Sequence, residues 1–201
     1  RNVIAEGAVQ KMLKADPAPF MLKRNAKLIE CGNLEDDLDK LKECDWIVEV
    51  VLEDLDIKHA TYEKIAKHRK KGSIVSSNTS TILLSKLTEG MDKDMLKNFM
   101  ITHFFNPVRY MRLLEIIQGD ATDQKAVNAI TEFCDVRLGK GVVRFLELRR
   151  GAVDTGIARP GAAAAAVPAA NIAIAHRLRA DTAHVFHHAA QLTGFLGAGL
   201  V

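Results

Sequence analysis

The sequence predicts an α/β fold in which helices cover both faces of a parallel sheet. Short apolar runs alternate along the chain with longer segments of helical period. The run from Trp46 to Leu52 is almost unbroken, with a single glutamate, as is typical of a strand buried on both faces. At 201 residues, with 48% hydrophobic and 26% charged residues, the chain has room for one domain or a domain and a half.

The first part of the chain is expected to hold four helical segments and two strands. The prolines of Asp16-Pro17-Ala18-Pro19 end the first, amphipathic helix, and Gly32-Asn33 stops the first strand. The acidic residue Asp56 suits the start of a longer helix. In order, the elements are the helix Ile4–Ala15, the helical piece Phe20–Ala26, the strand Leu28–Cys31, a short helix within Leu34–Cys44, the strand Trp46–Leu52 and the helix Asp56–Lys70.

The second part continues the alternation. Ser80 can cap a short helix, Asn106-Pro107 forms a turn, and Gly139-Lys140-Gly141 leads into the last strand. In order, the elements are the strand Ser73–Ser77, the helix Ser80–Leu87, the strands Met100–Phe105 and Met111–Ile117, the helix Asp123–Leu138 and the strand Val142–Leu146.

A histidine and a glutamate lie near the ends of two predicted strands that the Asn106-Pro107 turn connects, His103 before the turn and Glu115 after it. If the strands pair through that turn, the two side chains come within hydrogen-bonding distance. A carboxylate on one imidazole nitrogen fixes the tautomer and leaves the other nitrogen as a tuned base. The alternative is a core histidine and an unrelated surface glutamate.

Four sequence blocks resemble the signature blocks of the 3-hydroxyacyl-CoA dehydrogenase family, in the order and at the spacing of that family. They are Asp45-Trp46-Ile47-Val48-Glu49-Val50-Val51-Leu52-Glu53, Ser76-Ser77-Asn78-Thr79-Ser80-Thr81, His103-Phe104-Phe105-Asn106-Pro107-Val108 and Leu114-Glu115-Ile116-Ile117. The similarity runs from about Arg1 to Val143, and Arg109-Tyr110-Met111-Arg112 looks most like large bacterial members that also carry an enoyl-CoA hydratase domain. The resemblance implies a Rossmann-type domain that binds NAD.

The chain departs from that pattern at both ends. No Gly-x-Gly-x-x-Gly occurs in it, and it begins at Arg1 without a methionine. We therefore expect a fragment: a truncated Rossmann-type parallel sheet that lacks the first strand–helix–strand unit, with a gap between the Leu28 and Trp46 strands. The expected domains are a partial NAD-binding domain over residues 1–146 and an atypical tail over residues 147–201, in place of the C-terminal dehydrogenase domain.

The tail is rich in alanine, arginine and histidine. All 16 lysines of the chain lie at or before Lys140, whereas alanine fills 16 of residues 151–201. A frame-shifted reading explains such a switch, and a genuine low-complexity tail is the alternative. We expect the tail not to pack against the domain. His184, His187 and His188 have helical spacing, but we predict no metal site.

The resemblance assigns roles to the matched residues. His103 would be the general base for a 3-hydroxyl, Glu115 would orient it, Ser80 would bind the substrate hydroxyl or thioester, and Asn106 would hold substrate or nicotinamide. The alternatives are a helix cap for Ser80 and a turn former for Asn106.

Two further pairs are candidates. Glu53 and Lys58 would lie near the ribose and nicotinamide of the cofactor, beyond the Trp46 strand, with solvated loop charges as the alternative. Lys11 and Lys14 on the first helix would meet the phosphates of coenzyme A, with ordinary surface lysines as the alternative.

The implied function is the NAD-dependent oxidation of (S)-3-hydroxyacyl-CoA to 3-oxoacyl-CoA in fatty-acid β-oxidation, with acyl-CoA as the substrate. The chain as written is expected to be inactive. The alternatives are a related hydroxyacid dehydrogenase and a partial gene product without function.

Composition argues against several other classes. The net charge of +3 comes wholly from residues 144–201, so it is no sign of nucleic-acid binding. No 18-residue apolar run or signal peptide occurs, and Cys31, Cys44 and Cys134 lack metal-type spacing. These features predict reduced thiols, no membrane span, and a cytoplasmic or organelle-matrix protein. The parent protein is expected to be a homo-oligomer.

Overall fold

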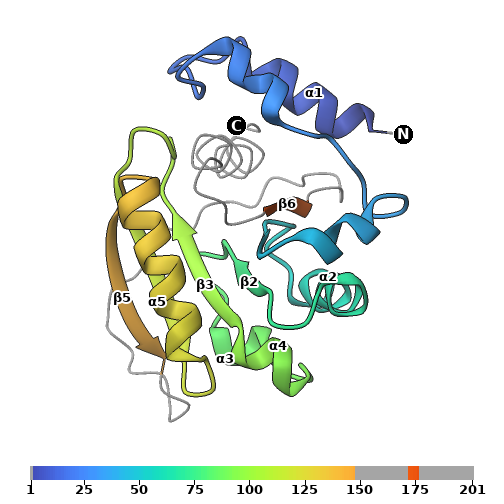
Figure 1. Cartoon of the computed structure of the whole chain (residues 1–201), viewed down its shortest axis with the longest axis vertical. Helices are drawn as coiled ribbons and strands as arrows, with labels where there is room; N and C mark the ends of the chain where they lie inside the picture. Colours follow the sequence, from blue (N-terminus) through green and yellow to red (C-terminus); the bar gives the residue numbers. More distant parts are fainter. Residues whose placement is uncertain (1, 148–171, 177–201) are drawn as a thin grey trace.

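A computed structural model of the chain describes residues 2–147 and 172–176, which form an α/β structure around one six-stranded sheet (Figure 1). The strand order is β5-β4-β3-β2-β1-β6. Strands β1, β2 and β3 are mutually parallel, β4 is antiparallel to β3, β5 is parallel to β4, and β6 is antiparallel to β1. The strands are β1 (Trp46–Glu49), β2 (Ile74–Ser77), β3 (Phe99–Phe104), β4 (Leu113–Gly119), β5 (Gly141–Glu147) and β6 (Ile172–His176). The predicted fold class is confirmed.

Helices flank the sheet, and aspartates begin three of them. Asp54, Asp92 and Asp123 each accept a hydrogen bond from a backbone N–H of the first turn that follows. The α-helices are α1 (Val3–Met12), α2 (Leu55–His68), α3 (Leu84–Leu87), α4 (Lys93–Lys97) and α5 (Gln124–Glu132); η1 (Lys23–Leu28) and η2 (Leu38–Glu43) are 3₁₀ helices, and η3 (Phe133–Arg137) is a π-helical turn. No helix within the described ranges is long and apolar enough to cross a membrane.

Two hydrophobic cores lie on opposite faces of the sheet, because alternate residues of a strand point to opposite sides. Trp46 and Val48 join the core beneath α5, while Ile47 joins the core that contains residues of α2, α3 and α4. This arrangement explains why β1 is apolar apart from Glu49, since the strand has no solvent-facing side. A third, smaller core belongs to the N-terminal segment and consists of Ala8, Val9, Met12 and Phe20.

Three sequence predictions about local structure are wrong. The helical piece expected over Phe20–Ala26 begins only at Lys23: residues 20–22 are not helical, and Lys23–Leu28 is a 3₁₀ helix. Ile29 has an extended backbone, but residues 28–31 form no strand, because a strand needs a hydrogen-bonded neighbour and none of the described strands pairs with this segment. The helix expected from Ser80 begins only at Leu84.

Part of the tail joins the sheet. β6 pairs with β1, with Trp46 opposite His176 and Glu49 opposite Ile172. Residues 172–176 therefore depart from the expectation that the tail does not pack against the domain, and they occupy the side of β1 where a gap was expected. Pairing satisfies backbone N–H and C=O groups that a bare edge would leave open. The rest of the tail, including His184, His187 and His188, lies outside the described residues, and the boundaries 1–146 and 147–201 stay predictions.

Candidate active site

The predicted contact between His103 and Glu115 is present. The antiparallel register of β3 and β4 places the two residues directly opposite one another. His103 Nδ1 lies 2.9 Å from Glu115 Oε2, and the two side chains are 15% and 19% exposed. Since an ionised carboxylate can only accept, Nδ1 carries the proton of this bond. The pair is therefore shielded but within reach of solvent.

The contact leaves Nε2 of His103 as the nitrogen that can exchange a proton. The ring is also held by Phe105, whose ring centroid lies 4.5 Å away at a tilt of 54°. A carboxylate on Nδ1 stabilises the imidazolium that forms when Nε2 takes up a proton. The arrangement can thus perform general base catalysis.

The loop that follows β2 is tied to the strand end that carries His103. Asn78 donates its backbone N–H to Glu49 O at 2.9 Å, and its side-chain Oδ1 accepts from Phe104 N at 2.9 Å. Ser80 follows two residues later and is exposed, as is Asn106 after β3. Ser80, Asn106 and His103 therefore gather at the carboxyl ends of β2 and β3, the edge at which such sheets bind ligands.

Glu53 organises the same loop from the end of β1. Its Oε1 accepts from the Thr79 hydroxyl, from Ser80 N at 3.1 Å, from Thr81 N at 3.0 Å and from Thr81 Oγ1 at 2.9 Å. Burial raises the pKa of Glu53, but the bonds from Thr79 and Thr81 and the charge of Lys58 outweigh burial and hold that pKa below its usual value. The carboxylate thus stays ionised and fixes the backbone on both sides of Ser80.

Lys58 is enclosed by protein groups, in contrast to its expected place beside the cofactor. The side chain is 1% exposed, and Nζ lies 2.9 Å from Glu49 Oε1, 3.4 Å from Val51 O and 3.5 Å from Glu53 Oε2. Its ammonium therefore forms ion pairs with two carboxylates at the junction of β1 and α2, the closer one with Glu49. Lys58 can influence a ligand at the sheet edge through Glu53.

Glu49, which the sequence analysis did not single out, is the centre of this network. Its side chain is fully buried and also accepts from Tyr62 OH at 2.7 Å, Ser77 Oγ at 2.8 Å and Val51 N at 2.6 Å. Burial raises the pKa of Tyr62, and the charge of Glu49 raises it further. The available signal was the lone glutamate inside an apolar strand, followed nine residues later by a lysine.

Lys140 anchors the loop between His103 and Glu115. Its side chain is 2% exposed, and Nζ donates to the backbone carbonyls of Val108 and Met111, the latter at 2.8 Å. Burial lowers the pKa of this ammonium. A buried cation that binds carbonyls fixes the loop that also carries Asn106, in which the Asn106–Pro107 bond is cis.

Lys11 and Lys14 are not joined to the His103–Glu115 pair. Lys11 lies in the last turn of α1 and Lys14 two residues beyond its end, and both are exposed. In the described part of the chain, neither ammonium has a hydrogen bond or an ion pair. No group of three or more His, Cys, Asp or Glu residues in that same part could hold a metal ion.

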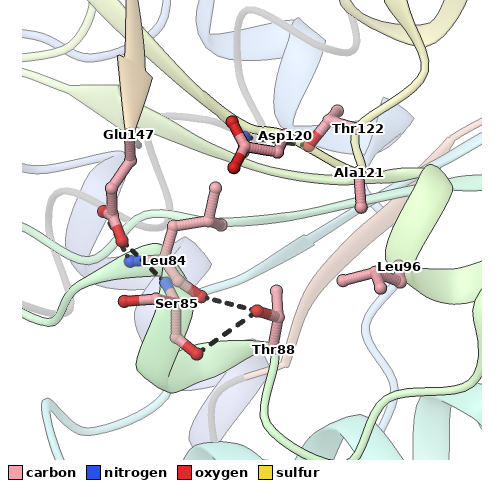
Figure 2. A pocket seen from close by; sticks show the side chains of 9 residues that line it. Leu84, Ser85, Thr88, Leu96, Asp120, Ala121, Thr122 and Glu147 are labelled. Atoms are coloured by element: carbon pink, nitrogen blue, oxygen red, sulfur yellow. Dashed lines mark hydrogen bonds between the residues drawn. The ribbon is translucent and has the colours of Figure 1, made fainter. Parts of the chain in front are cut away.

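A shallow pocket lies at the opposite edge of the sheet (Figure 2). Its wall includes Gly119 at the end of β4 and Thr122, whose hydroxyl donates to the carbonyl of Phe99 at the start of β3. Figure 2 shows Glu147 bound to the first turn of α3, where its carboxylate accepts from Leu84 N at 2.9 Å and Ser85 N at 2.8 Å. This pocket is separated from His103 by the length of β3.

Comparison with known proteins agrees with these features. The sequence profile of the family described as "3-hydroxyacyl-CoA dehydrogenase, NAD binding domain" matches residues 4–148. A probable 3-hydroxyacyl-CoA dehydrogenase of Deinococcus radiodurans is 50% identical over 143 residues, which are 71% of this chain and 41% of that protein. A protein of the same name from Bacillus subtilis is 48% identical over 143 residues, 71% of this chain and 18% of that protein.

A solved structure agrees as well. The structure of (S)-3-hydroxybutyryl-CoA dehydrogenase from Ralstonia eutropha is similar with a TM-score of 0.50 and 32% identity, over 55% of this chain and 38% of that one. The chain thus spans less than half the length of these relatives.

Proposed function

Because the chain belongs to the NAD-binding domain family of 3-hydroxyacyl-CoA dehydrogenases, we propose that its protein oxidises (S)-3-hydroxyacyl-CoA to 3-oxoacyl-CoA in fatty-acid β-oxidation. NAD is the cofactor of this family. The observation that carries the proposal is the 2.9 Å contact between His103 and Glu115, beside the loop that holds Ser80. A base with a partly buried carboxylate that orients it is suited to the removal of a hydroxyl proton.

The oxidation removes a proton from the 3-hydroxyl and a hydride from C3. NAD, when bound, supplies the hydride acceptor. His103 Nε2 takes the hydroxyl proton, and the Glu115 carboxylate on Nδ1 stabilises the resulting imidazolium. Such a positioned base typically accelerates proton transfer by about 10²–10⁴-fold.

Ser80 and Asn106 position the reacting groups. Both are exposed at the sheet edge next to His103. Ser80 is held there because Asn78, two residues before it, binds the backbone of Phe104, and Asn106 follows His103 by three residues. We assign Ser80 to the hydroxyl or thioester of the substrate, and Asn106 to the substrate or the nicotinamide. Hydrogen bonds from rigid loops hold the C3–O bond within reach of the base.

The residues at this edge fit the nicotinamide end of the cofactor. Ser80 and Asn106 offer exposed polar groups there, whereas the enclosed Lys58 acts on the site through Glu53. The printed sequence contains no Gly-x-Gly-x-x-Gly, so it offers no counterpart of the loop that usually receives the pyrophosphate. The residues at this edge therefore fit the nicotinamide end of NAD, where hydride transfer takes place.

The proposal is tested in a chimera, in which the matching segment of this chain replaces that of the Bacillus subtilis relative. NADH formation from (S)-3-hydroxybutyryl-CoA is followed by absorbance. We expect His103→Gln to abolish turnover with nearly unchanged NAD affinity, and Glu115→Gln to cost less because the base remains. His68→Gln, on the exterior of α2, is the matched control.

Two outcomes would contradict the proposal. One is full activity of the His103→Gln chimera, which would show that His103 is not the general base. The other is a folded chimera that oxidises free 3-hydroxybutyrate better than the thioester, which would favour a hydroxyacid dehydrogenase of a related family.

A further inference from the structure

The N-terminal helix unit, residues 2–31, has a core of its own. Ala8, Val9 and Met12 of α1 pack with Phe20, apart from the two cores of the sheet. In Figure 1, α1 lies at the top of the molecule, away from the strands. The orientation of this unit relative to the sheet therefore depends on the hydrogen bonds that join it to the rest of the domain.

Arg109 and Tyr110 supply such a connection. Arg109 Nη1 donates to Ala18 O at 2.7 Å and to Phe20 O at 3.3 Å, and Tyr110 OH donates to Ala18 O at 3.0 Å. The two side chains also support each other, with Arg109 Cζ 5.1 Å from the Tyr110 ring centroid. About 90 residues separate the partners along the chain, so this is a tertiary link.

The same loop is fixed on its other side. Lys140 binds the carbonyls of Val108 and Met111, which bracket Arg109 and Tyr110. His103 precedes this loop and Glu115 follows it, on paired strands. A continuous chain of contacts thus runs from the N-terminal helix unit to the catalytic pair.

We propose that Arg109 and Tyr110 are positioning residues that set the N-terminal helix unit at a fixed distance from the His103–Glu115 pair, so that one acyl-CoA molecule reaches both. This inference rests on the proposed function and adds to it that Lys11 and Lys14, exposed in and just beyond the last turn of α1, receive the phosphates of coenzyme A. The acyl end then lies at His103 and the nucleotide end at α1.

A ligand held at both ends gains affinity from the fixed geometry. Once one end binds, the other meets its site at a high effective concentration, which falls when the two sites move freely. Loss of the Arg109 bonds therefore weakens ligands that span both sites. A ligand that reaches only His103 is unaffected.

The test measures two affinities on the full 201-residue chain. The imidazole signal of His103, assigned through His103→Gln, is followed by NMR during titration with (S)-3-hydroxybutyryl-CoA and, separately, with its N-acetylcysteamine thioester, which lacks the nucleotide. We expect Arg109→Met to weaken the CoA thioester at least about tenfold and to leave the shorter thioester unchanged. Tyr110→Phe should do the same to a smaller extent, since one bond to Ala18 is lost.

Two further variants make the result specific. Arg109→Lys should restore most of the affinity, because a single nitrogen of Arg109 makes both backbone bonds. Arg112→Met is the matched control: Arg112 is in the same loop but donates to Gly139 O, away from residues 18–20.

The outcomes separate the two claims. If both thioesters weaken equally, or neither does, Arg109 has no positioning role and the inference is overturned while the proposed function stands. If neither thioester moves the His103 signal in the unaltered chain, the proposed substrate class is overturned and the inference falls with it.

Discussion

Replacing Glu49 by glutamine should destabilise the fold strongly. The carboxylate is fully buried and faces four donors: Lys58 Nζ at 2.9 Å, Tyr62 OH at 2.7 Å, Ser77 Oγ at 2.8 Å and Val51 N at 2.6 Å. Glutamine keeps the shape of the side chain but removes its charge, and its amide NH₂ group, a hydrogen-bond donor, then faces groups that are themselves donors. Lys58, 1% exposed, keeps only the more distant Glu53 as a charged partner.

The magnitude follows from burial. Removing one partner of a buried ion pair costs about 3–5 kcal/mol, since the other charge stays buried and uncompensated. With a urea dependence of about 2 kcal/mol per M for a chain of this size, the midpoint should fall by about 2 M. The matched control is Glu89→Gln, whose partner is Lys86 and whose pair is 57% and 56% exposed. Its urea midpoint should stay close to that of the unaltered chain, because solvent screens an exposed ion pair.

The assay is urea unfolding followed by tryptophan fluorescence. Trp46 is the single tryptophan of the chain, and it is fully buried in β1, the strand that ends in Glu49. A loss below about 1 kcal/mol for Glu49→Gln would refute the reasoning. Adding Lys58→Met to Glu49→Gln should recover part of the loss, because the unpaired ammonium is then gone.

Three further predictions concern the loops and the cofactor. Burial lowers the pKa of Lys140 in the folded chain below the ordinary lysine value of 10.5. At a pH between the folded and the unfolded pKa, the unfolded chain binds more protons, so the free energy of unfolding should rise with pH. The urea midpoint of Lys140→Met should lack this rise. Glu53→Ala should speed amide hydrogen exchange at Ser80 and Thr81 by about tenfold or more, because both N–H groups lose their acceptor. Unchanged rates would show that the loop keeps its conformation without Glu53. Calorimetry should detect no binding of NAD to the 201-residue chain, since it contains no Gly-x-Gly-x-x-Gly; micromolar binding would show that another backbone receives the pyrophosphate.

The sequence was sufficient for features that depend on local pattern. Apolar runs and helical period indicated the α/β class, because burial on both faces of a strand favours a nearly unbroken apolar run, as in Trp46–Leu52 with its single glutamate. The His103–Glu115 contact was predictable because a short turn between two strands restricts their register. The likeness to a known family added roles to these residues.

The tertiary structure decided the contacts between segments far apart in the chain. Residues 29–31 form no strand because no described strand pairs with them, whereas residues 172–176 form one because they pair with β1. Glu49 and Lys58 neutralise each other only where β1 meets α2, and Arg109 finds Ala18 across some 90 residues. Periodicity reports which face of an element is buried, whereas a buried charge or a distant hydrogen bond depends on what that face meets.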